Sequence, residues 1–175
     1  MTTAIRQLIV TQLDTLFKSI LAPTDGWAAP DAWWGNDVWG PVIYNTNLGN
    51  NIFWWRDLEK NPFQLSELPG MVCRDTNQTT VRAVGQHEHT LTIEGVIMVA
   101  AADSGETARY LIADITTAIG SNCPPNVCLG GYAQDIGPLE SEVFDVQHEG
   151  KKGFGVSFQF PVQFCTAPFN PYTQA

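Results

Sequence analysis

The feature that most constrains the fold is a regular alternation near the C-terminus, GFGVSFQFPVQF at positions 153–164. Every second residue is large and apolar, and the residues between are small or polar. Successive side chains of a strand point to opposite faces of a sheet, so this stretch predicts a strand with one buried face. Pro161 interrupts the polar positions. Because proline cannot donate to a sheet ladder and is largely confined to edge strands, strand starts and bulges, it predicts an open sheet edge, which has to be protected or to find a partner.

The rest of the chain alternates between helical and strand patterns. Apolar residues at three- and four-residue spacing predict amphipathic helices within 2–23 and 103–120. Beyond Gly95 both faces of a predicted strand become apolar, which indicates a central strand or a bulge at this glycine. The predicted strands are 71–75, 88–101, 139–149 and 153–166, of which the last two form a hairpin. Together they predict an α+β fold, with an antiparallel or mixed β-sheet flanked by two α-helices.

All six tryptophans of the chain lie between residues 23 and 68, among glycine, asparagine, aspartate and proline. Within this segment, residues 38–57 predict two short strands joined by a turn at 45–51. We interpret 23–68 as an inserted Trp-rich β-hairpin or Ω-like loop that is packed by its own aromatic side chains. A length of 175 residues fits a single domain, 1–175, with this insertion and an extended Pro-rich tail at 167–175.

The charge of the chain limits its partners. There are 18 acidic and 9 basic residues, a formal charge of −9 and an isoelectric point near 4.5. Because affinity for phosphate depends on clustered Lys and Arg, this balance argues against DNA or an anionic membrane as a ligand, although DNA can pass nearby. No apolar run reaches membrane-spanning length and no signal peptide precedes the first helix, which predicts assembly in the cytoplasm.

Motifs for catalysis are missing from the sequence. Cys123 and Cys128 have a C-x4-C spacing that zinc sites do not use, and we interpret the four cysteines as buried or loop thiols of a reducing compartment. His87 and His89 share a strand face, but a metal site would need a third ligand such as His148, so we interpret them as polar residues of an exposed strand. With no nucleophile elbow, phosphate loop or dinucleotide fingerprint, we expect no enzyme, no metal and no cofactor.

The order of these patterns resembles a known family. The N-terminal helix is followed by LPGMVCRD (68–75), HTLTIEGVIMVAA (89–101), ETARYLIADITTAIG (106–120) and FDVQHEGKKGFGVSFQFPVQFCT (144–166). This arrangement, over 1–21 and about 69–166, resembles the bacteriophage tail terminator and tail completion proteins, including the minor tail protein U type. The Trp-rich stretch is longer than this family leads us to expect.

The resemblance implies a structural virion protein. Such proteins form a homo-hexameric ring that caps the head-proximal end of the tail tube, stops tube polymerisation and joins the tail to the neck. Its expected partners are copies of itself, the tail tube protein, a neck or connector protein and, in a contractile tail, the sheath protein. DNA is expected only as passing cargo, and no membrane is involved. The expected location is the tail or neck region of the virion, assembled in the host cytoplasm.

A ring suggests roles for particular residues. Subunits joined head to tail close their open sheet edges through their neighbours, and carboxylates on a channel wall repel passing phosphates. The predicted channel-facing acids are Glu140, Glu142, Asp145 and Glu149. The predicted contacts with other subunits or partners are Trp33, Trp34, Trp39, Trp54, Trp55, Lys151, Lys152 and Pro161.

Two other functions remain open on the sequence. The chain fits another neck or head-closure connector component, because the general build is the same and only the location differs. A small carbohydrate- or ligand-binding module that uses the tryptophans is the third hypothesis, since aromatic faces also stack on sugars and bases.

Overall fold

The computed structural model describes residues 3–21, 44, 46–100, 105–122, 128–148 and 151–174. These residues form two α-helices, two short 3₁₀ turns and a six-stranded mixed sheet, which confirms the predicted α+β class. In chain order the elements are α1 (Ile5–Lys18), β1 (Ile52–Trp54), η1 (Leu65–Glu67), β2 (Gly70–Ala83), β3 (Gln86–Val99), α2 (Gly105–Ser121), η2 (Leu129–Gly131), β4 (Asp135–Ile136), β5 (Glu140–His148) and β6 (Lys151–Thr166).

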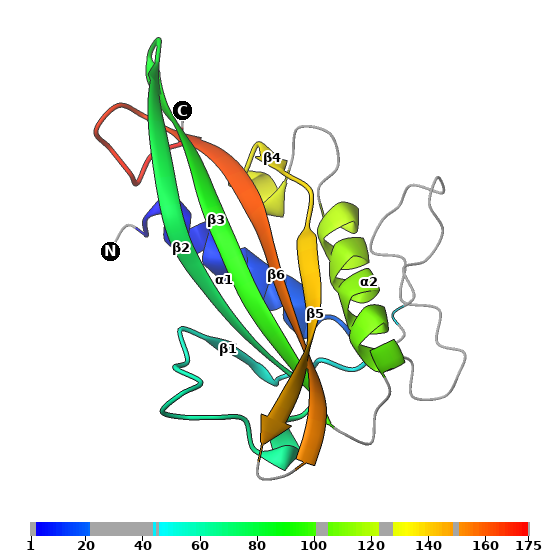
Figure 1. Cartoon of the computed structure of the whole chain (residues 1–175). Helices are drawn as coiled ribbons and strands as arrows, with labels where there is room; N and C mark the ends of the chain where they lie inside the picture. Colours follow the sequence, from blue (N-terminus) through cyan, green and yellow to red (C-terminus); the bar gives the residue numbers. More distant parts are fainter. Residues whose placement is uncertain are drawn as a thin grey trace, which may run out of the picture.

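The sheet is built around two long central strands, β3 and β6 (Figure 1). Its order is β1-β2-β3-β6-β4, and β5 pairs with β6 on the margin that β4 also uses. Among the described strands, only the β1–β2 pair is parallel; the others are antiparallel. The predicted hairpin of β5 and β6 is confirmed.

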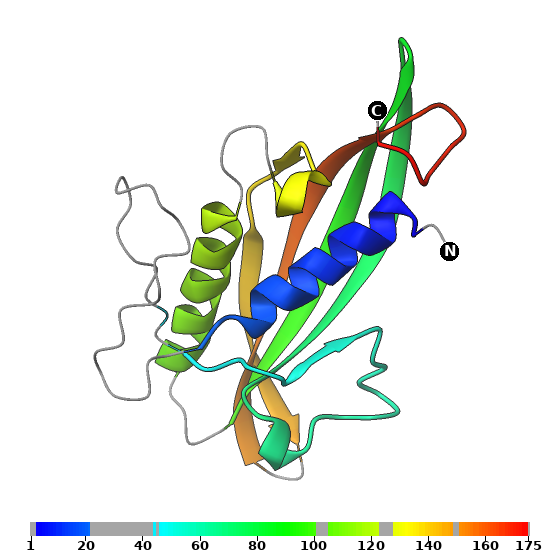
Figure 2. The same cartoon turned by 180° about the vertical axis from the view of Figure 1, so that it is seen from behind.

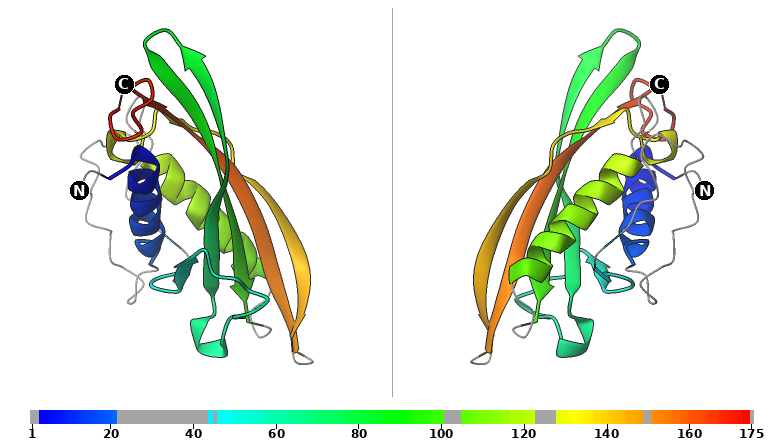
Figure 3. Two further views of the ribbon diagram at one scale, coloured as in Figure 1. Left: turned by 90° about the vertical axis from the view of Figure 1, so that its left-hand side faces the viewer. Right: turned by 90° about the vertical axis from the view of Figure 1, so that its right-hand side faces the viewer.

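Both α-helices lie on the same face of the sheet, and no α-helix of the described residues covers the opposite face (Figures 2 and 3). The alternation of β3 and β6 turns their apolar side chains toward the helices, where they are fully or almost fully buried. The largest of these core side chains are Ile9, Leu13, Phe17, Leu91, Ile93, Ile97, Leu111, Ile115 and Phe160. The sheet therefore has one apolar, covered face and one open face.

Gly95 lies within the central strand β3, as one of the two sequence interpretations proposed, and no bulge occurs there. A Cβ at this position would lie 2.2 Å from the ring of Phe158 on β6. The glycine is required because the aromatic ring crosses the strand at this point. The one register shift between β2 and β3 lies elsewhere, between Asp75 and Gln78.

The prediction that Pro161 marks an open edge is wrong, because β6 is paired along both margins. Gly137 N donates to Pro161 O at 2.8 Å, so the ring nitrogen of Pro161 also faces the β4–β5 margin. Pairing with β5 stops at Gln159 and pairing with β4 begins at Val162. Proline is tolerated in this central strand because it lies where the neighbouring pairing is interrupted.

β2 is much longer than the predicted strand at 71–75, and it continues to Ala83 before turning into β3. The turn is made by Val84 and Gly85, and Gly85 has a positive φ of 79° that glycine adopts without strain. The β2–β3 hairpin extends beyond the rest of the described structure (Figures 1 and 3). The predicted strand at 71–75 does not include this projection.

No Trp-rich hairpin is found among the described residues. Its second predicted strand exists as β1, but β1 pairs in parallel with Met71–Cys73 of β2 instead of with the segment upstream. Of the first predicted strand, only Tyr44 belongs to the described residues. The parallel pairing is possible because residues 55–69 form a return loop between β1 and β2.

Residues 167–174 do not run extended. Ala167 N donates to Thr173 O at 2.9 Å, and Ile5 N at the start of α1 donates to Pro171 O at 3.0 Å. The last residues thereby fold back onto the first turn of α1 and satisfy one of its free backbone donors. Neither of the helices in the described ranges has the length and hydropathy that a membrane crossing requires.

Candidate functional site

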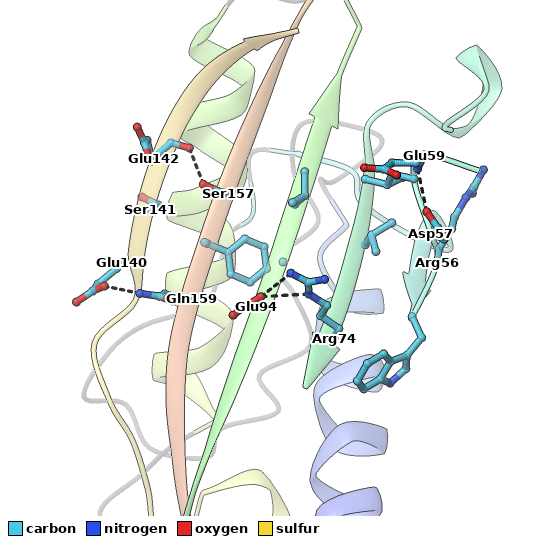
Figure 4. Close-up of a pocket in the computed structure, with 16 residues that line it drawn as sticks. Arg56, Asp57, Glu59, Arg74, Glu94, Glu140, Ser141, Glu142, Ser157 and Gln159 are labelled. Carbon is cyan, nitrogen blue, oxygen red and sulfur yellow. Dashed lines mark hydrogen bonds and ion pairs between the residues drawn. The ribbon is translucent and has the colours of Figure 1, made fainter. Parts of the chain in front are cut away.

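The open face of the sheet is hollowed into a groove of about 930 Å³ (Figure 4). Strands β2, β3 and β6 form its floor, β5 forms one rim, and the loop after β1 forms the other. We call this the sheet groove; its lining residues are 55–59, Val72, Arg74, 94–96, 140–142 and 157–159.

Strand register explains how these residues meet. Arg74 pairs with Glu94, Glu94 with Gln159 and Gln159 with Glu140, so one row of polar side chains crosses four strands. A second row, two residues along, runs from Val72 across β3 and β6 to β5. Because residues i and i+2 share a face, both rows lie on the side away from the helices.

Polar contacts tie the floor together. Arg74 Nη2 lies 2.9 Å from Glu94 Oε2, and Thr76 Oγ1 donates to Glu94 Oε1 at 3.0 Å. Gln159 Nε2 donates to Glu140 Oε2 at 2.8 Å (Figure 4). These cross-strand pairs fix the side chains flat against the sheet and leave the space above them open.

The loop rim is held by Arg56, whose side chain is 8% exposed. Its guanidinium is 2.9 Å from Glu67 Oε2, donates to Pro62 O at 2.7 Å and lies over the rings of Phe53 and Phe63 at 4.4 and 5.1 Å from their centroids. The hydrogen-bonded ion pair with Arg56 holds the pKa of the Glu67 carboxyl below its usual value. The buried guanidinium of Arg56 thus fixes the conformation of the loop after β1, and this loop forms a defined rim of the groove.

The two tryptophans next to this rim have opposite environments. Trp54 packs against the core, and its Nε1 donates to Asp14 Oδ1 at 3.2 Å. Trp55 is 60% exposed and has a positive φ of 62°, which is rare for a bulky residue. Its amide donates to Cys73 O at 2.9 Å, so the sheet itself keeps the indole at the groove.

The groove is predominantly acidic. Five carboxylates and two guanidinium groups line it, and both guanidinium groups already face a carboxylate, Arg56 facing Glu67 and Arg74 facing Glu94. Lys60 holds the pKa of Asp57 below its usual value. The carboxylates that line the groove are Asp57, Glu59, Glu94, Glu140 and Glu142. Such a surface attracts a positively charged group more than an anion.

The predicted channel acids do not form one surface. Glu140 and Glu142 are exposed and line the groove, whereas Asp145 is exposed at an odd position of β5 and therefore belongs to its opposite face. Glu149 lies outside the described residues. Their role in a channel stays a prediction.

The predicted contact residues are also dispersed. Trp33, Trp34 and Trp39 lie outside the described residues, and for Lys151 and Lys152 only the backbone, in β6, is described. Pro161 is half-buried in the middle of the sheet. Of the predicted contact residues, the structure brings only Trp55 to the groove. Residues 57–59, 72 and 94–96 line the groove beside it, and sequence reasoning missed them.

The described histidines and cysteines make no metal site. His89 is buried, with Nδ1 2.9 Å from Thr80 Oγ1 and Nε2 2.9 Å from Thr166 Oγ1, so both ring nitrogens are engaged within the fold. Within the described ranges, no three His, Cys, Asp or Glu side chains are grouped to hold a metal ion. Cys73 and Cys165 are free, buried thiols as predicted, but Cys128 is disulfide-bonded, which corrects that prediction.

No protein-family model matches the chain, and no curated protein matches it either. The groove and the hairpin therefore have to be interpreted from their own chemistry.

Proposed function

We propose that this chain is a structural protein of a bacteriophage virion, a tail terminator. Copies of it form a ring, expected to be hexameric, on the head-proximal end of the tail tube. The ring stops tube polymerisation and presents a surface to the neck or connector protein. In a contractile tail it also contacts the last sheath ring. The Trp-rich segment 23–68 is an added contact with one of these partners.

The observation that supports this proposal best is a sheet of which the described residues cover only one face. Helices protect one face, whereas the other face is open and hollowed, and the β2–β3 hairpin extends beyond the rest of the described structure. Beyond Cys73, no described strand pairs with the outer margin of β2. Open strand margins and projecting hairpins are features that proteins normally protect, so their presence favours a chain that works in an assembly.

The charge of the chain agrees with a ring through which DNA passes. With 18 acidic and 9 basic residues, the inner wall of such a ring repels phosphate and lets DNA slide without binding. Among the described residues, the acidic groove offers no cluster of cations that would bind DNA.

The proposal is tested with purified chain and tubes grown from the tube protein of the same virus. We expect native mass spectrometry to show a closed oligomer, and negative-stain microscopy to show one ring at a single end of each tube. Tubes grown in its presence should be shorter, because capped ends cannot add subunits.

Three results would count against it. Chain that stays monomeric at high concentration and never binds a tube end excludes tail termination. A ring that binds isolated portal vertices but ignores tubes reassigns the chain to the neck, and saturable quenching of tryptophan fluorescence by a glycan supports the ligand-binding alternative instead.

A further inference from the structure

The tip of the β2–β3 hairpin, residues 81–86, is exposed at Val81, Arg82, Val84 and Gly85 and half-buried at Ala83 and Gln86. Val84 is fully exposed and Val81 is 63% exposed, and a Cβ on Gly85 would meet no atom within 4 Å. Arg82 is exposed, makes no ion pair with a described residue, and is the one charged residue of the tip. The tip is therefore a small apolar surface with one positive charge.

The sheet groove has the complementary properties. Its carboxylates outnumber its guanidinium groups, Glu59 and Glu142 have no ion-pair partner among the described residues, and the Trp55 indole provides an apolar wall. The groove crosses four strands, or roughly 14 Å at the usual spacing between strands. A two-stranded tip, with strand axes roughly 5 Å apart, fits this width.

We propose that the hairpin tip of one copy seats in the sheet groove of the next copy. Arg82 enters among the groove carboxylates, and Val84 packs against Trp55. Tip and groove are different surfaces of the same chain, so the contact is head to tail and can propagate around a ring. The inference rests on the proposed function, and it places Glu140 and Glu142 at a subunit boundary instead of on the channel wall.

Charge reversal tests the contact. Arg82→Glu should raise the dissociation constant of the ring at least about tenfold, because a like charge enters an acidic groove, and Val84→Asp should act in the same direction. Arg82→Lys keeps the charge and is the matched control. Glu142→Lys alone should also weaken the ring, and the Arg82→Glu/Glu142→Lys double variant should recover most of the association. Native mass spectrometry gives the oligomer, and circular dichroism verifies folding.

Cross-linking tests the location. A chain with Val84→Cys, mixed with a chain carrying Gln159→Cys in the groove, should give a disulfide-linked pair under mild oxidation. Gln163→Cys is the control, because it is exposed on the same face of β6 but roughly 13 Å further along the strand. Cys73 and Cys165 are buried and do not compete. Equal cross-linking at positions 159 and 163 would overturn the proposed seat.

The outcomes separate the two proposals. If the wild-type chain forms rings and caps tubes while Arg82→Glu and Val84→Asp assemble equally well, the tip-in-groove contact is wrong and the tail-terminator function stands. If the wild-type chain is monomeric at every concentration and the Val84→Cys and Gln159→Cys chains give no cross-link, both are wrong.

Discussion

At Gly95 a missing side chain lets the Phe158 ring cross the central strand, and at Pro161 a missing N–H is tolerated because the neighbouring strands stop there. Both residues weaken an isolated strand. The destabilisation by Gly95 is offset by the packing of the Phe158 ring. The missing N–H of Pro161 costs little because the pairing of β6 with β5 and β4 is interrupted there. Such positions are decided by tertiary context, and the alternation pattern alone does not identify them.

Substituting Gly95 with alanine should destabilise the fold by about 1–3 kcal/mol, because the new Cβ overlaps a ring that is held between strands. Chemical denaturation measures the loss. Gly120→Ala is the control, since Gly120 is an exposed helical position with no atom near its added Cβ, and the change should be neutral or stabilising by up to about 1 kcal/mol. Equal stability of both variants would contradict the packing argument.

Thr46 joins the segment before β1 to α2. Its amide and its hydroxyl donate to Asp114 Oδ2 at 2.8 and 2.6 Å, and both residues are buried. Thr46→Val should lower the free energy of unfolding by about 1.5–3 kcal/mol, because a buried hydrogen bond to a carboxylate is lost. Thr46→Ser retains the hydroxyl and should cost clearly less. A valine variant as stable as the serine variant would show that the hydroxyl contributes nothing.

At the scale of elements, the base of the hairpin is joined to β6 by the buried imidazole of His89. Burial, assisted by the neighbouring His87, lowers the pKa of His89 from its usual value of 6.5. Protonation of His89 is therefore less favourable in the folded state than in the unfolded state. Stability is complete above pH 6.5 and is lost as the pH falls from there toward the lowered pKa.

We therefore expect the free energy of unfolding to decrease as the pH falls below about 6.5, and His89→Gln to remove this part of the decrease. Denaturant titrations across this range measure it. His87→Gln is the comparison, because it leaves the buried imidazole in place and should keep most of the slope. An unchanged slope in His89→Gln would assign the acid sensitivity to carboxylates instead.

Elements with a strong local period were predictable from the sequence: both helices, β3 and the β5–β6 hairpin. The second half of β2 was not, because residues 76–80 are polar on both faces and residues 76–83 show no alternation of burial. The available signal was the β-branched run at 79–81 followed by Val84-Gly85. The parallel β1–β2 pair and the groove join residues distant in sequence, for which no local pattern exists.

For the molecule as a whole, the proposed contact is partly electrostatic, so it should depend on salt. Raising NaCl from about 50 to 500 mM shortens the screening length and should weaken self-association several-fold. In Arg82→Gln this salt dependence should be largely absent, because the attracted charge is gone. Analytical ultracentrifugation measures both. Identical salt curves for the two chains would indicate that other charges, or none, drive assembly.

The hydrogen bond from Ile5 to Pro171 has a practical consequence for anyone who handles this protein. It holds the last described residues against the start of α1, and the C-terminus lies toward the hairpin end of the molecule (Figure 1). An affinity tag or fluorescent fusion on either side would crowd that end and block neighbours from approaching. Labels belong instead on exposed sites of α2, such as Thr117, on the face of the helix turned to solvent.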